Sequence, residues 1–143
     1  MLTNPFALPV HPMLVHFPIA MLTTMWVCLV VRYATGHERW DERARLFQII
    51  GLGTLPFAMV AALVDTRGFE FVVNPRWDAP LIWHAVAGLG AAAVFGGHFF
   101  WRRRFAPDRM TGWIAVADLG LASAGLWALI TVGLIAGEMV YNA

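Results

Sequence analysis

Histidine residues that could bind a metal ion or a cofactor stand at the beginnings of two long apolar segments. His11 and His16 open the first segment, and His84 opens the third. Imidazole is both a proton carrier and a common ligand of metal ions and haem iron. Two carboxylates, Asp65 and Glu138, end the second and fourth apolar segments. If the segments run in alternating directions, these five residues share one end of the molecule, where the sequence predicts a site.

Four apolar segments must position these residues. A helix needs roughly 20 apolar residues to cross a bilayer core about 30 Å thick, and each segment is close to that length. One acidic residue, Asp118, interrupts the fourth segment. The pattern predicts a single transmembrane domain over 1–143, with helices near 12–32, 45–64, 80–101 and 111–138.

The composition excludes most other classes of protein. Of the 143 residues, 59% are hydrophobic and only 13% are charged, whereas a soluble domain has roughly 25% charged residues. The net charge of +1 argues against nucleic-acid binding, which needs a clustered basic face. A single cysteine, Cys28, excludes an internal disulfide and a thiolate metal cluster. An integral membrane protein remains.

The links between the apolar segments are short, and they predict both the topology and the orientation. Short links force neighbouring helices to run antiparallel, so the predicted fold is an all-α, up-down-up-down four-helix bundle. The first and third links hold eight of the ten arginines, and the second holds two. Because positive residues favour the cytoplasmic side, we expect a multi-pass protein of the bacterial inner membrane with both termini on the periplasmic side.

A stripe of small residues follows His84 along the third segment. Gly88, Ala92 and Gly96 recur at intervals of four residues. One interpretation is close helix–helix packing. The other is a slot for a haem b group, with His84 and His16 as axial ligands from facing helices and Gly88 beside the ring. Pro18 removes a helical hydrogen bond, and we expect the resulting kink to turn His16 into the bundle.

Three functions remain open at this point. The first is a b-type haem or redox subunit that exchanges electrons with a protein partner. The second is a site for zinc, copper or iron without a porphyrin, with ligands drawn from His11, His16, His84, Asp65 and Glu138. The third is a structural or assembly subunit with no cofactor. Recognised catalytic motifs are lacking, which argues against an enzyme, and a transporter with four helices and no repeat would require a homo-oligomer.

Asp118 is the other informative position. A carboxylate inside a membrane span is costly unless it is paired, so Asp118 should face the bundle, in a structural contact or a proton relay. Partners at matching depth are Thr23, Thr24, Gln48 and His98. His98 itself is interpreted as an interfacial residue beside Trp101, with a ligand of a second haem as the alternative.

The opening motif His-Pro-Met-Leu-Val-His-Phe-Pro, from His11 to Pro18, resembles the signature of a prokaryotic membrane family called domain of unknown function 2231. The resemblance extends to the four apolar segments, to Asp65 and to His84. It implies a four-helix membrane protein. Some members of the family carry a Rieske-type iron–sulfur domain, which implies a redox setting for the family, although this chain contains no such domain.

Overall fold

The computed structural model describes residues 10–65, 80–105 and 110–141, and these residues form four long helices. In chain order they are α1 (Val10–Thr35), α2 (Arg39–Asp65), α4 (Pro80–Arg102) and α5 (Gly112–Tyr141). All four are long and apolar enough to cross a membrane. The predicted all-α membrane bundle is therefore confirmed.

A glycine turn separates the first two helices. Gly36 has a φ of 74°, which is the left-handed conformation that glycine adopts without steric cost. Its backbone N–H donates to the carbonyl of Arg32 over 2.9 Å, and this bond ends α1. Only two residues then precede the start of α2, so α1 and α2 must fold back on each other.

Helix α2 begins six residues before the start expected from hydropathy, at Arg39 instead of residue 45. Its first turn contains Asp41 and Glu42. Negative side chains there interact favourably with the helix dipole, so a charged stretch can extend a helix beyond its apolar part. Asp41 consequently sits on a helix and not in a link.

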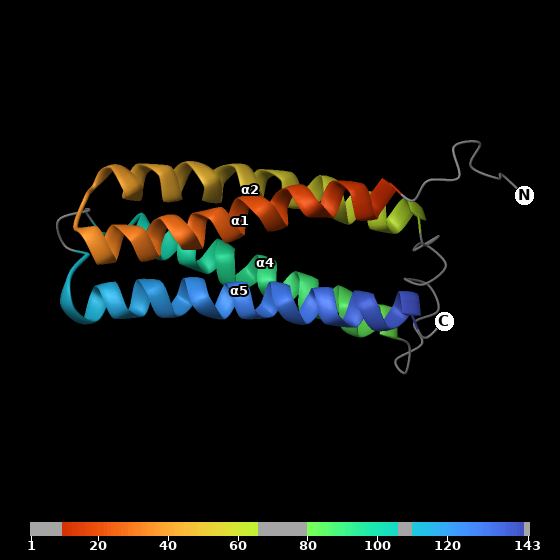
Figure 1. The fold of residues 1–143 in the computed structure, drawn as a ribbon. Coiled ribbons are helices and arrows are strands. Elements are labelled where there is room, and N and C mark those ends of the chain that lie inside the picture. The colour runs from red at the N-terminus through yellow and green to blue at the C-terminus, as the bar shows by residue number, and fades with distance from the viewer. Residues whose placement is uncertain (1–9, 66–79, 106–109, 142–143) are drawn as a thin grey trace, which may run out of the picture.

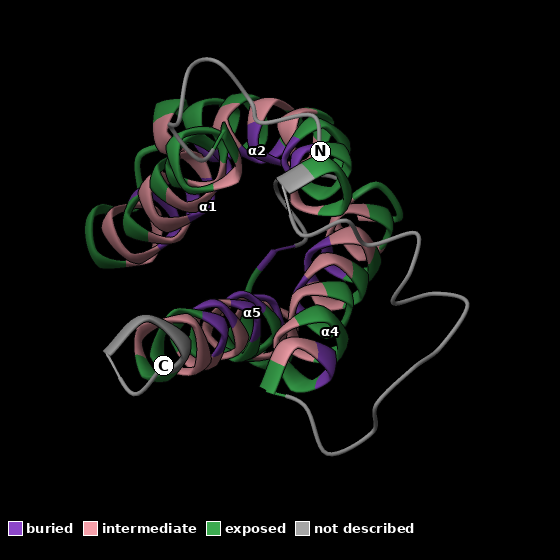
Figure 2. Cartoon of the chain, turned by 90° about the vertical axis from the view of Figure 1, so that its right-hand side faces the viewer, coloured by how far each residue is buried: buried purple, intermediate pink, exposed green. Residues whose placement is uncertain are grey.

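The helices form two hairpins, α1–α2 and α4–α5, and each hairpin has a much larger interface within itself than with the other hairpin. Successive helices run in alternating directions along the long axis of the bundle (Figure 1). We call the end where α1 meets α2 the Arg-rich end, and the opposite end, where α1 begins and α5 ends, the terminal end. Buried residues face the middle of the bundle and exposed residues face outwards (Figure 2).

Two glycines allow close contacts inside the hairpins. A Cβ atom added at Gly51 would lie 2.8 Å from the side chain of Leu22, and one at Gly125 would lie 2.8 Å from the ring of Phe95. Leu22 and Phe95 are both fully buried. Small residues let transmembrane helices approach each other in this way.

The interpretation of the stripe on α4 as a close-packing face does not hold at its two glycines. A Cβ atom added at Gly88 or at Gly96 would meet nothing within 4 Å. Close contact on α4 is instead made by Phe95, a large residue that packs against the glycine of its neighbour. Large apolar side chains such as Phe57 and Trp127, which are 69% and 70% exposed, cover the outer surface, as expected for a surface in contact with lipid tails.

Candidate functional site

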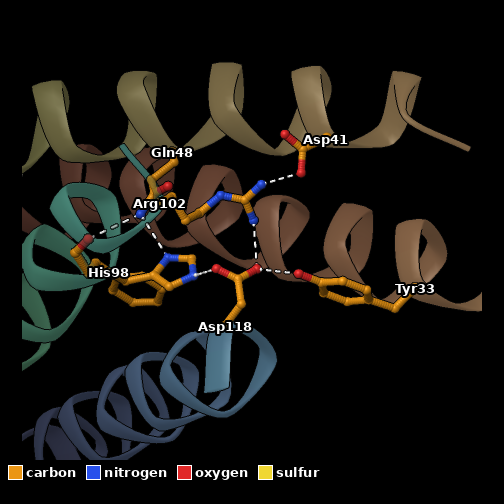
Figure 3. Close-up of polar contacts among 7 residues, drawn as sticks. Tyr33, Asp41, Gln48, His98, Arg102 and Asp118 are labelled. Atoms are coloured by element: carbon orange, nitrogen blue, oxygen red, sulfur yellow. Dashed lines mark hydrogen bonds and ion pairs between the residues drawn. The ribbon is translucent and has the colours of Figure 1, made fainter. Parts of the chain in front are cut away.

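Among the described residues, the most extensive polar site lies at the Arg-rich end and is centred on Asp118. This carboxylate has no exposed surface. It accepts hydrogen bonds from the hydroxyl of Tyr33 at 2.8 Å, from Nη1 of Arg102 at 2.8 Å and from Nε2 of His98 at 3.0 Å. We use the name polar network for the connected side chains in Figure 3, which are Tyr33, Asp41, Gln48, His98, Arg102 and Asp118.

The hydrogen bonds of Gln48 determine the protonation of His98. The side-chain amide nitrogen of Gln48 donates to the carbonyl of Phe95 at 3.0 Å and lies 3.0 Å from Nδ1 of His98. Rotating the amide by 180° would place its oxygen against the Phe95 carbonyl, so the nitrogen must stay where it is. Nδ1 of His98 therefore accepts, and the ring is the neutral tautomer whose Nε2–H donates to Asp118.

Arg102 joins three helices. From α4, its Nη1 donates to Asp118 on α5, while Nη2 donates to Asp41 on α2. The guanidinium group is nearly buried, with 9% of the side chain exposed. A planar guanidinium with donors on both sides suits this position between two carboxylates.

The prediction that Asp118 faces the bundle and is paired is confirmed, and His98 is one of the partners expected from depth. The interfacial interpretation of His98 is wrong, because its side chain is fully buried between Gln48 and Asp118. Sequence reasoning missed Tyr33, Asp41 and Arg102. One signal was present: Arg102 follows His98 by four residues, which places both side chains on one face of a helix.

The terminal end brings together a different pair of histidines from the expected one. The rings of His11 and His84 lie edge to face, with centroids 6.1 Å apart. Nδ1 of His11 lies 2.8 Å from the carbonyl of Ala58 on α2, and therefore donates to it. Nδ1 of His84 is buried and has no hydrogen-bond partner among the residues described.

The prediction that His16 points into the bundle is wrong. Its side chain is exposed, and its Nδ1 bonds to the carbonyl of Pro12 on the same helix. His11 and His16 are five residues apart, which is roughly 140° around a helix. Helix α1 continues through Pro18, whose ring is buried. The rotation that buries Pro18 and turns His11 inwards therefore turns His16 outwards.

The other predicted site residues do not join this pair in the part of the chain that the structure describes. Glu138 lies on α5 with its side chain exposed. The side chain of Asp65 is outside the described residues. Gly88 lies one turn from His84 with open space beside it. Within the described ranges, no group of three or more acidic, histidine or cysteine side chains could hold a metal ion.

Comparison with known proteins identifies the family. A family model described as predicted membrane protein, domain of unknown function 2231, matches residues 7–143. The chain belongs to this family. No curated protein and no solved structure matches the chain.

Proposed function

We propose that the chain is a structural subunit of the bacterial inner membrane, and that the polar network fixes how its two hairpins pair. The observation that supports this most directly is that Asp118 on α5 receives bonds from α1 and α4, and that Arg102 extends the connection to α2. The network therefore connects all four helices.

Polar contacts between the two hairpins can determine how the hairpins pair within a membrane. Lipid tails are as apolar as leucine, so apolar surface alone gives two membrane hairpins little reason to choose one pairing over another. A buried, fully bonded polar group favours one arrangement, because any other leaves charges unpaired. One further bond connects the hairpins near mid-depth, from Nε1 of Trp26 to the hydroxyl of Ser123 at 2.9 Å.

Replacing the central carboxylate tests the proposal. We expect Asp118→Asn to lower the free energy of unfolding by about 2 kcal/mol, since up to three interhelical bonds are weakened, each worth about 0.6 kcal/mol in a membrane. The measurement is thermal unfolding of the full chain in detergent. Glu138→Gln removes an exposed carboxylate of the same helix at the opposite end and should leave the melting temperature unchanged. Equal melting of the two variants would contradict the proposal.

A second candidate is a metal or haem site at the terminal end, supported by the contact between His11 and His84. The bond from His11 to Ala58 places the ring's lone pair on Nε2, and metal-binding histidines commonly donate their other N–H to a backbone carbonyl. Because a metal–nitrogen bond is about 2 Å long, a centroid distance of 6.1 Å is compatible with one ion between the two rings.

An absorption spectrum and a metal analysis of the purified chain test this second candidate. A haem site requires a Soret band and a zinc site requires bound metal without colour, and His84→Ala should abolish either one. His16→Ala serves as the control, because His16 is exposed and should not affect a site built on His11 and His84. A wild-type chain with neither metal nor Soret band would remove this candidate.

A further inference from the structure

A cavity at the Arg-rich end lies beside the polar network and carries an excess of positive charge. It has a volume of about 70 Å³ and lies between α2 and α4. Its lining contains three arginines, Arg45, Arg102 and Arg103, and one acidic residue, Asp41. Because positive side chains outnumber negative ones in the lining by three to one, the cavity favours binding of an anion.

The three arginines of the lining are not equally available to bind an anion. Arg102 is held by two carboxylates, those of Asp41 and Asp118. Arg45 and Arg103 are exposed and form no ion pair with any carboxylate among the described residues. The guanidinium of Arg103 lies 5.5 Å from the centroid of the Phe99 ring, which holds it over the cavity wall. Two exposed arginines, Arg45 on α2 and Arg103 directly after the end of α4, therefore line the cavity.

The size of the cavity and its depth in the membrane indicate the kind of anion. One water needs roughly 10–15 Å³ of such space, so about 70 Å³ accommodates a group of about five heavy atoms, such as a phosphate. The cavity lies where the apolar spans end, at the level of lipid headgroups. Basic pockets between transmembrane helices bind anionic headgroups, and guanidinium groups match phosphate oxygens in geometry.

We propose that Arg45 and Arg103 bind a phosphate group in this cavity, as the phosphodiester of an anionic lipid or as free phosphate. The ligand is held at the rim by these two arginines, above a floor formed by Arg102 and Gln48. Arg102 and Gln48 also belong to the polar network, whereas Arg45 and Arg103 do not. Replacing Arg45 and Arg103 therefore tests the anion site without changing a residue of that network.

The test compares lipid binding by two double variants of the full chain in neutral detergent. Native mass spectrometry measures the binding of phosphatidylglycerol and of phosphatidylcholine to each protein. We expect the wild type to prefer phosphatidylglycerol, and Arg45→Gln combined with Arg103→Gln to reduce that preference by about tenfold, because charged hydrogen bonds to phosphate are lost. The control combines Arg39→Gln with Arg104→Gln, which removes two exposed arginines of the same end that do not line the cavity.

The possible outcomes distinguish binding in the cavity from general attraction to surface arginines, and a lipid ligand from free phosphate. Loss of preference in the cavity variant, with retention in the control, supports the proposal. Equal loss in both variants, or loss in neither, overturns it. Inorganic phosphate added at millimolar concentration distinguishes the sources: displacement of phosphatidylglycerol indicates a shared site, whereas phosphate binding without lipid preference assigns the cavity to the free ion. Unchanged melting of both variants shows that the fold is intact.

Discussion

Gln48 has one orientation that satisfies both of its neighbours, and this gives the buried histidine a defined protonation state. Its amide nitrogen faces the carbonyl of Phe95 and Nδ1 of His98. Nitrogen-15 NMR of the ring near neutral pH should therefore show a protonated Nε2 and an unprotonated Nδ1. An imidazolium in the wild-type protein would contradict this assignment.

The substitution Gln48→Glu should change that state. A carboxylate has no hydrogen to donate, so its oxygen and the lone pair of Nδ1 would repel each other. Protonation of Nδ1 removes the repulsion, and we expect the spectrum of His98 to become that of an imidazolium. Gln48→Met is the control, because it removes the amide without adding charge and should leave the ring neutral. A ring that stays neutral in Gln48→Glu while the new carboxyl group is ionised would show that Gln48 does not set the tautomer.

Single residues also show what the sequence could and could not predict about the site. The pairing of Asp118 was predictable, because an unpaired charge at that depth in a bilayer is costly whichever way its helix is rotated. Tyr33, Asp41 and Arg102 lie near the ends of their helices, where a polar side chain is equally compatible with water. Whether they turn inwards depends on the rotation of each helix, which depth does not reveal.

At the scale of the helices, that rotation is hard to predict because the helices are apolar on every side. In a soluble protein, a polar face marks the surface and the opposite face marks the core. Here large apolar residues such as Phe57 and Trp127 face outwards, so hydropathy does not distinguish the faces. The prediction that His16 points into the bundle was wrong for this reason, whereas the existence of the four helices followed directly from segment length.

The close contact between α4 and α5 leads to a prediction at this scale. A methyl group at Gly125 would lie 2.8 Å from the fully buried ring of Phe95. We expect Gly125→Ala to lower the free energy of unfolding by roughly 1–3 kcal/mol, the usual cost of overpacking. Gly133→Ala is the matched control, because its methyl group would meet nothing within 4 Å on the same helix. Thermal unfolding in detergent measures both, and equal stability of the two variants would show that the ring can move aside.

For the whole molecule, the distribution of arginines predicts the direction of insertion. Seven of them are described at the Arg-rich end, on or beside the ends of α1, α2 and α4, namely Arg32, Arg39, Arg43, Arg45, Arg102, Arg103 and Arg104. The positive-inside rule then directs this end to the cytoplasm. A reporter that is active only in the periplasm should give a signal when fused after Ala143. Signal from a reporter that is active only in the cytoplasm would show that the orientation is the opposite one, with the cavity on the outer face.

The uneven placement of the bonds between hairpins has a mechanical consequence. The bonds described lie at the Arg-rich end and near mid-depth, at Trp26, whereas the terminal end has the ring contact of His11 and His84. A small change of angle between the hairpins at the Arg-rich end, where the described bonds between them are concentrated, is therefore amplified along the helices towards the terminal end. Helix α5 has 30 residues and is about 45 Å long. A tilt of about 3° at the fastened end would thus move the other end by about 2 Å along that lever arm.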